Sequence, residues 1–252
     1  MSTQSATEQS AAVDQLAGAA PENEFVRVPG RTLSNGTVVL DFLIGKYLSR
    51  FNDDASVSIN VEAVPTVRIS YFSAAAKCLA AGLPMLTLSQ SAALAHEVAE
   101  QAANWSGGAV GQGILLQGLH KGNVTGAVHG DFESGQRDER RGFVLSTGEV
   151  VFDVAGHLYT WLRDDVHGDE RGLVAVKRFP KDSPVVCGAP YPSMENGVGW
   201  YPDAGSNWSG RALIRGGCWY SHARAGVFRL NSDSPDGSSN GVGVRCTKPI
   251  GL

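Results

Sequence analysis

The sequence lacks any run of about 18 apolar residues, the length needed for a membrane-spanning helix, so no membrane insertion is expected. Residues 1–24 lack the basic start and apolar core of a secretion signal, because Glu8 and Asp14 stand where that core would be. Only 18% of the residues are charged and the net charge is −4, which gives no general attraction to nucleic acid. These absences argue against a membrane protein, a signal-bearing secreted protein and a nucleic-acid-binding protein.

Cysteine is sparse, and no Cys-x-x-Cys pair occurs. The wide spacing argues against a structural zinc site. Two disulfides are possible by number alone, but without a secretion signal reduced thiols are the better expectation. The four positions are Cys78, Cys187, Cys218 and Cys246.

Glycine, by contrast, is abundant, with 31 among 252 residues, and 42% of the chain is apolar. This composition predicts a fold with an ample core, many tight turns and long loops rather than a helical bundle. Residues 1–24, rich in Ser, Ala, Gln and Glu, are expected to form a disordered tail ahead of one domain over 25–252. Residues 25–29 and 37–40 are strand candidates around an Asn-Gly turn, which favours a tight hairpin, and residues 42–51 are ambiguous.

Two helices are predicted next. The first runs from Ser70, a plausible N-cap, to Ala81, and Gly82 ends it. The second runs from Thr87 to Asn104 and opens with the Thr-x-x-Gln spacing of a capping box. The first helix is expected to use as its apolar face Ala75, Ala76 and Leu79.

The rest of the chain predicts short strands separated by loops. Strands are expected at 143–145 and 150–154, and residues 158–162 form another apolar and aromatic piece. Residues 180–210 are expected to form surface loops. The mixed-charge run 137–141 is interpreted as a solvated, self-neutralising loop. Together these elements predict an α+β domain with small antiparallel sheets and much irregular structure.

Three stretches, in order along the chain, carry a resemblance. They are residues 66–78 with the following Gly82-Leu83-Pro84 link, residues 148–161, and residues 211–246. Together they resemble the formylglycine-generating-enzyme (sulfatase-modifying factor) type of C-type lectin fold. The resemblance covers roughly residues 25 to 250 and implies that fold for the domain.

Within that family the chain looks most like the variable proteins of diversity-generating retroelements. This likeness rests on Arg215-Gly216-Gly217-x-Trp219, on the insert Ala225-Gly226-Val227-Phe228-x-Leu230, and on the closing Gly243-x-Arg245. In such proteins, mutation directed at template adenines changes a C-terminal segment and so varies one ligand-binding surface. The resemblance implies a non-enzymatic ligand-binding protein with its variable segment at about 211–246.

The residue types in that segment agree with this interpretation. Mutating the adenines of an AAC codon cannot produce Lys, Glu, Gln, Met or Trp. Between Cys218 and Val244 there is no Lys, Glu, Gln or Met, and the sole tryptophan, Trp219, stands at a presumed fixed position. The pattern supports the interpretation.

The enzymatic members of the family bind copper(I) between two cysteines, and soft thiolates suit that ion. The matching positions here are Ser221 and Gly226. At the family's calcium-type ligands, His157 and Thr160 replace Asn and Glu, and the lost carboxylate removes affinity for a hard cation. No catalytic residue, metal or cofactor is therefore expected, and His157 is interpreted as a partly buried histidine that hydrogen-bonds a loop.

A binding surface needs neither a metal site nor a catalytic residue. The segment offers tyrosine, arginine and small polar residues, the mixture that antibody paratopes use. Ala225, Val227 and Phe228 are expected to hold the backbone, and Trp200 and Trp208 are the tryptophans most suited to join the surface. The candidate ligand-binding residues are Cys218, Tyr220, Ser221, His222, Arg224, Arg229, Asn231, Asp233 and Asp236.

The expected partner is an unidentified protein or cell-surface ligand, met in the cytoplasm or on a phage virion, and the oligomeric state stays open. Two other functions remain as alternatives. One is an enzyme of the sulfatase-modifying-factor superfamily with an altered active site. The other is a structural or receptor-binding component of a phage tail that uses the same segment for assembly.

Overall fold

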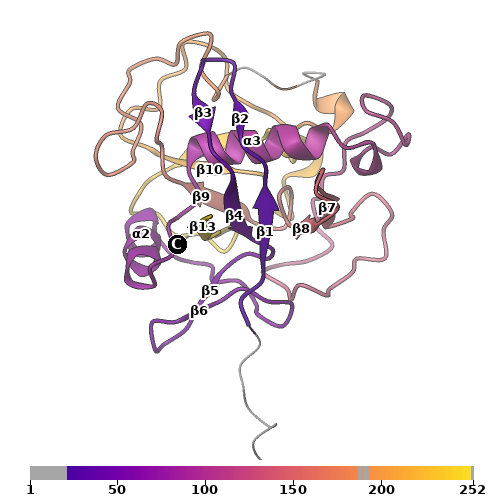
Figure 1. Cartoon of the computed structure of the whole chain (residues 1–252), viewed down its shortest axis with the longest axis horizontal. Helices are drawn as coiled ribbons and strands as arrows, with labels where there is room; N and C mark the ends of the chain where they lie inside the picture. Colours follow the sequence, from indigo (N-terminus) through magenta and orange to yellow (C-terminus); the bar gives the residue numbers. More distant parts are fainter. Residues whose placement is uncertain (1–21, 187–188, 190–192, 251–252) are drawn as a thin grey trace, which may run out of the picture.

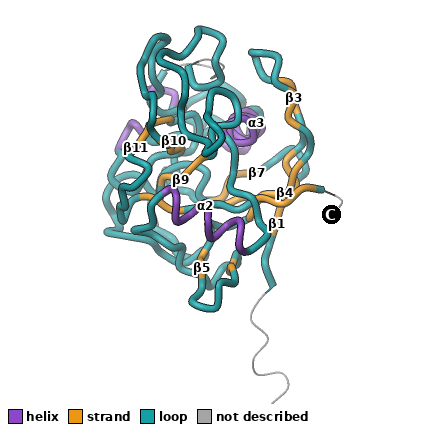
Figure 2. Tube along the Cα trace, turned by 90° about the vertical axis from the view of Figure 1, so that its left-hand side faces the viewer, coloured by secondary structure: helices purple, strands orange, loops and turns teal. Residues whose placement is uncertain are grey.

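The structure is a computed structural model that describes residues 22–186, 189 and 193–250. Over these residues it contains two α-helices and five small sheets joined by long loops, which confirms the predicted loop-rich α+β architecture (Figure 2). Residues 1–21 of the expected tail lie outside the described residues. Asn23 already belongs to the ordered part, because its side chain donates to the Val57 carbonyl at 2.9 Å.

The N-terminal strands pair differently from the prediction. The Asn-Gly turn joins only the short ribbon of β2 and β3, whereas β1 pairs antiparallel with β4. Val26 lies opposite Ile44 and both are buried, whereas Val38 on β3 is exposed, so the β1–β4 pair buries more apolar surface. These strands are β1 (Phe25–Val28), β2 (Arg31–Thr32), β3 (Val38–Val39), β4 (Phe42–Gly45), β5 (Arg50–Phe51) and β6 (Val57–Ser58).

Both helices begin as predicted. Ser70 caps α2 (Tyr71–Ala80) by accepting from the Ser73 N–H at 3.2 Å. At the start of α3 (Leu88–Ala99), Thr87 forms both bonds of the capping box with Gln90, at 3.1 and 3.2 Å.

The prediction that the second helix continues to Asn104 is wrong. It ends at Ala99, and a 3-10 turn, η1 (Ala102–Asn104), follows. Two side chains take its last carbonyls: Asn104 Nδ2 donates to Val98 O, and Trp105 Nε1 donates to Ala99 O, both at 2.8 Å. These bonds satisfy helix-end acceptors that would otherwise have no partner.

The predicted apolar face of α2 is also wrong. Leu79 is 83% exposed, and the helix instead buries Tyr71, Ala74 and Cys78. These three positions follow the i, i+3, i+7 spacing of one helix face. Cys78 lies with its sulfur 3.7 Å from that of Cys246.

Those two cysteines and Cys218 are free thiols, as expected, and Cys187 lies outside the described residues.

The remaining strands agree with the predicted positions where these were given. They are β7 (Gly142–Val144), β8 (Val150–Phe152), β9 (Tyr159–Leu162), β10 (Ala212–Arg215), β11 (Leu230–Asp233), β12 (Val242–Gly243) and β13 (Thr247–Pro249).

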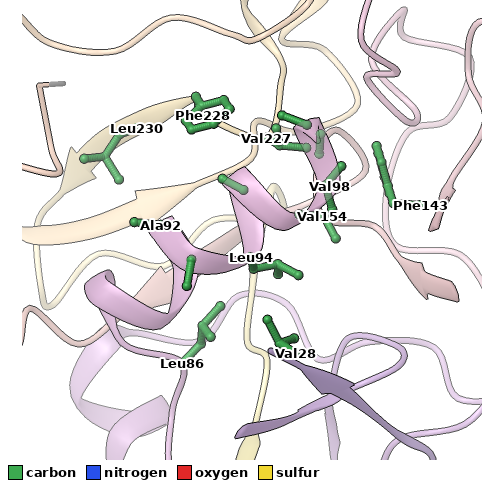
Figure 3. Packing of buried hydrophobic residues seen from close by; sticks show 14 of the residues in the cluster. Val28, Leu86, Ala92, Leu94, Val98, Phe143, Val154, Val227, Phe228 and Leu230 are labelled. Atoms are coloured by element: carbon green, nitrogen blue, oxygen red, sulfur yellow. The ribbon is translucent and has the colours of Figure 1, made fainter. Parts of the chain in front are cut away.

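A four-stranded sheet in the order β11-β10-β9-β12 carries the C-terminal half, and β13 joins β1 and β4 in a separate three-stranded sheet. One face of the four-stranded sheet packs on α3, which runs across the middle of the molecule in Figure 1. Figure 3 shows Ala92 and Val98 of α3 in the same cluster as Val227, Phe228 and Leu230. The C-terminal segment is therefore anchored in the main core.

The opposite face belongs to a second core cluster that includes Tyr159, Trp161, Ile214 and Val242. The α2 helix contributes to this cluster through Tyr71, whose ring meets Trp161 edge-on at 6.0 Å. Because successive side chains in a strand point to opposite faces, the same strands serve both clusters.

The charged run at 137–141 is not the solvated loop that was expected, because Glu139 and Arg141 are buried. Arg141 forms a bidentate ion pair with Asp153, at 2.8 and 2.7 Å. Burial alone would raise the pKa of Asp153, but the His157 ring and the Arg141 guanidinium together hold that pKa well below its usual range.

His157 itself is fully buried rather than partly buried. Its Nε2 accepts from the Val128 N–H at 3.0 Å, so the histidine does bond a loop, as interpreted. With Nε2 accepting, Nδ1 carries the proton, and it lies 3.1 Å from the Asp153 carboxylate. This histidine supports the fold beneath the C-terminal segment.

Candidate functional site

An open cleft of about 860 Å³ lies over the face of the four-stranded sheet that α3 does not cover. Only Tyr159 and Met194 of its lining residues lie outside the C-terminal segment 211–246. The segment contributes Ile214, Tyr220, Ser221, His222, Ala223, Arg224, Arg229, Asn231, Ser232, Asp233, Ser239 and Val242.

Strand register explains the floor of the cleft. Asn231 on β11 lies directly opposite Ile214 on β10, and Tyr159 on β9 lies opposite Val242 on β12. Residues paired directly across neighbouring strands point to the same face of a sheet. Apolar floor residues and the polar Asn231 therefore meet in one surface.

The rim of the cleft is a short 3-10 turn, η3 (His222–Arg224), held by its main chain rather than by its exposed side chains. The His222 N–H donates to His120 O at 2.8 Å. The buried amide of Gln117 donates to the Ala225 carbonyl at 2.6 Å. Side chains on this turn can therefore change without removing the bonds that hold it.

After the turn the chain returns to the core. Ala225 and Val227 are fully buried, and Phe228 is nearly so. Gly226 lies against other backbone, where an added Cβ would come within 2.3 Å of the Val198 carbonyl carbon. Arg215, also buried, donates to the Val227 carbonyl at 3.1 Å. This part of the segment is scaffold.

Arg229 differs from the other polar residues of the cleft because only 7% of it is exposed. Its Nε donates to the Tyr159 hydroxyl at 2.9 Å. Its guanidinium carbon lies 5.0 Å from the ring centroid of Trp200 and 5.7 Å from that of Tyr159. These contacts fix the guanidinium in one place at the cleft wall.

The structure brings seven of the nine candidate residues into this one cleft, namely Tyr220, Ser221, His222, Arg224, Arg229, Asn231 and Asp233. Tyr220 is exposed, with 52% of it accessible. Asp236 is exposed but lies on the following loop, outside the cleft lining.

The prediction that Cys218 contacts the ligand is wrong for this conformation, because the residue is 0% exposed. Its sulfur lies 3.5 Å from the Ser221 hydroxyl, and Trp219 beside it is buried as well. The chain turns outward only at Tyr220, two residues later than the candidate set began.

Of the two loop tryptophans, only Trp200 lies beside the cleft. Trp200 is 37% exposed, and the guanidinium carbon of Arg229 lies over its ring, 5.0 Å from the centroid. Trp208 instead packs edge-on against Phe179 at 5.6 Å and does not line the cleft.

Sequence reasoning also missed cleft residues. Strand alternation around 158–162 was the signal that could have identified Tyr159. Met194 lies on a 3-10 turn, η2 (Met194–Asn196), where no periodic pattern marks it.

The positions that match the copper-binding cysteines of the enzymatic family members hold other residues here. At the positions where the copper-binding enzymes carry cysteines, Ser221 accepts from the Cys218 N–H at 2.9 Å and Gly226 contacts backbone. Within residues 22–186, 189 and 193–250, no three His, Cys, Asp or Glu side chains form a group that could hold a metal ion. Over the same part of the chain, no helix is long and apolar enough to cross a membrane.

The fold and the cleft define a loop-rich α+β domain that presents one C-terminal surface, and comparison with solved structures finds similar chains. The Major Tropism Determinant I1 Variant is 14% identical, with a TM-score of 0.45, over 82% of this chain and 50% of that one. Treponema denticola variable protein 1 is 14% identical, with a TM-score of 0.39, over 91% and 93%. PvdO from Pseudomonas aeruginosa is 13% identical, with a TM-score of 0.41, over 90% and 95%.

All three likenesses are distant. This chain spans about half the length of the Major Tropism Determinant variants that it matches first. No family model matches the chain, and no curated protein matches it.

Proposed function

We propose that this chain is a non-enzymatic ligand-binding protein of the C-type lectin type, whose cleft is diversified by a retroelement. Its ligand is a protein or another cell-surface molecule, and it acts in the cytoplasm or on a phage virion. Residues 25–252 form the binding domain, and the segment from about 211 to 246 is the part that varies.

The observation that carries the proposal is the division within the C-terminal segment. Side chains at 225, 227 and 228 are buried, whereas 220–224, 231 and 233 line an open cleft. The turn that carries the rim is held by main-chain bonds, such as that from the His222 N–H. Surface substitutions away from the core usually change stability by about 0.5 kcal/mol or less. Such a segment tolerates many sequences on one fold, which is what diversification requires.

The altered-enzyme alternative has less support. The copper-binding cysteine positions hold Ser221 and Gly226, and Cys218 is buried three residues away from the first of them. Elemental analysis of purified protein tests this alternative, because a stoichiometric metal that survives dialysis would favour an enzyme. The phage-tail alternative predicts a defined oligomer with residues 218–240 covered, and cross-linking combined with hydrogen exchange tests it.

The DNA around the gene provides the main test. We expect a near-copy of the codons for residues 211–246 beside a reverse-transcriptase gene, with mismatches confined to template adenines. The mismatched codons should be those of the cleft, with Tyr220, Arg224 and Asn231 among them. Mismatches concentrated instead at Ala225, Val227 and Phe228 would contradict the division between scaffold and surface. Absence of any such copy would remove the diversification part of the proposal.

A further inference from the structure

We propose that the cleft of this version recognises a carboxylate on an acidic segment of its protein ligand, and that Arg229 is the residue that binds it. The inference rests on the proposed ligand-binding function and adds the chemistry of the ligand. It starts from a guanidinium that the fold buries without a counter-charge.

Arg229 has no carboxylate partner among the described residues. Two other buried guanidiniums of the segment also lack such a pair, but both are occupied by carbonyls: Arg215 donates to Val227 O, and Arg245 donates to Gly45 O and Asp153 O. Arg141, buried elsewhere, has Asp153. A buried charge is costly unless it is paired and hydrogen-bonded, so an unpaired guanidinium at a cleft wall is poised for an anion.

The known contacts of Arg229 do not involve the two terminal nitrogens of its guanidinium. Its Nε is occupied by the Tyr159 hydroxyl, and its faces lie near the rings of Tyr159 and Trp200. The two terminal nitrogens remain, and their parallel N–H groups match the two oxygens of a planar carboxylate. The guanidinium is already ordered, so little side-chain entropy is lost when an anion binds.

The acidic residue of the cleft lining, Asp233, does not fill this role. Asp233 instead lies 3.8 Å from Arg211, and its Oδ1 accepts from the Ser234 N–H at 2.7 Å. A second guanidinium, Arg224, is exposed on the rim and adds positive potential. The cleft therefore favours an incoming negative charge.

The rest of the cleft lining indicates what kind of ligand residue stands next to the acidic one. Met194, which is 46% exposed, supplies apolar surface in the cleft, and Tyr220 adds an exposed ring. An acidic side chain next to an aromatic or aliphatic one in a peptide segment fits this combination. A free inorganic anion would use the guanidinium and leave Met194 and Tyr220 uncovered.

The test uses the full chain labelled with ¹⁵N and titrated with two blocked dipeptide amides, N-acetyl-Asp-Phe and N-acetyl-Asn-Phe, and with inorganic phosphate. NMR follows the Nε–Hε signal of Arg229, assigned through its contacts with the Tyr159 ring. We expect the Asp dipeptide to shift this signal saturably and to bind at least about tenfold more tightly than the Asn dipeptide, since hydrogen bonds to charged groups are the stronger ones. Phosphate is expected to bind more weakly than the Asp dipeptide.

Two variants complete the design. Arg229→Lys keeps the charge but loses the forked donors, and it should weaken binding of the Asp dipeptide by about tenfold. Arg224→Gln is the matched control, an exposed guanidinium of the same cleft, and it should weaken binding by less. Equal binding of the two dipeptides, no binding of either, tighter binding of phosphate, or a larger effect of Arg224→Gln would overturn the inference. If Arg229→Lys does not fold, the comparison of the two dipeptides on the unchanged protein decides.

Failure here is distinguishable from failure of the proposed function. Dipeptide binding does not depend on a retroelement, and the DNA test does not depend on Arg229. A template copy found together with indifference to the carboxylate would overturn only the inference. Carboxylate binding without any template copy would overturn only the diversification.

Discussion

The side-chain amide of Gln117 donates to the carbonyl of Ala225 at 2.6 Å, across 108 residues of sequence. Gln117 is buried, and its bond fixes the end of the turn that forms the rim of the cleft. A loop far from the C-terminal segment therefore decides where that segment leaves the core. The first prediction tests this link.

We expect Gln117→Leu to destabilise the protein by about 1–3 kcal/mol, because it leaves a buried carbonyl without its donor. Urea unfolding measures this loss. Hydrogen exchange should also become faster at the amides of Arg224 and Ala225. The exposed Gln112 provides the control, and Gln112→Leu should change neither quantity appreciably. Unchanged exchange at the rim in the Gln117 variant would contradict the assigned role.

Trp219 and Arg224 separate scaffold from surface. Trp219 is buried in the second core cluster, so Trp219→Ala should cost about 3–5 kcal/mol. Arg224 is exposed, so Arg224→Ala should change the free energy of unfolding by about 0.5 kcal/mol or less. Chemical denaturation of both variants checks the ranking. A comparable loss in both would mean that the rim itself supports the fold.

The loss of stability caused by replacing Arg229 should lie between those of Trp219→Ala and Arg224→Ala. Arg229→Ala removes a buried stem, a hydrogen bond and a cation–π contact, and we expect a loss of about 1–3 kcal/mol. Tyr159→Phe removes only the hydroxyl that accepts from Arg229 and should cost about 1 kcal/mol. Thermal or urea unfolding of both variants tests this. If Arg229→Ala proved as mild as Arg224→Ala, the guanidinium would not be held as described.

The buried Arg141–Asp153 pair predicts a pH dependence. The pKa of Asp153 is depressed in the folded state, so the pair contributes stability above the unfolded-state value of about 3.9. That contribution is lost as the pH falls below this value toward the folded pKa. The free energy of unfolding should therefore decline as the pH falls below about 5. Urea titrations at each pH measure this decline.

Arg141→Met should destabilise the protein at pH 7 by about 3–5 kcal/mol, because it leaves a buried carboxylate without its partner. It should also flatten the decline in acid. The exposed Arg27–Asp41 pair supplies the control, and Arg27→Met should cost about 1 kcal/mol or less. Equal effects of the two substitutions would show that burial of the Arg141 pair contributes little.

Much of the candidate site was predictable because it depends on local residue types. The shift from small polar residues to the rigid Ala225–Phe228 insert indicated which part of the segment would be buried. Cap residues at Ser70 and Thr87 likewise act on backbone groups within three residues, so their roles could be inferred from spacing alone.

Other features depended on distant partners. The face that α2 buries was decided by contact with Trp161, about ninety residues later, which turns Tyr71 inward and leaves Leu79 exposed. The partner of β1 was decided by which pairing buries more apolar surface, although a strong turn signal pointed elsewhere. The burial of Arg141 required Asp153 and could not be inferred from a charged run.

The sequence by itself determined the α+β class, the helix starts and the C-terminal segment where a variable surface is expected, because turn chemistry, capping and residue vocabulary act over a few neighbours. The tertiary structure decided that Cys218 points inward and that Arg229 is held near Tyr159 and Trp200. It also decided that Tyr159, Ile214 and Val242 form the floor. These outcomes depend on strand register and on side chains far apart in the chain, which meet only when the sheet has formed.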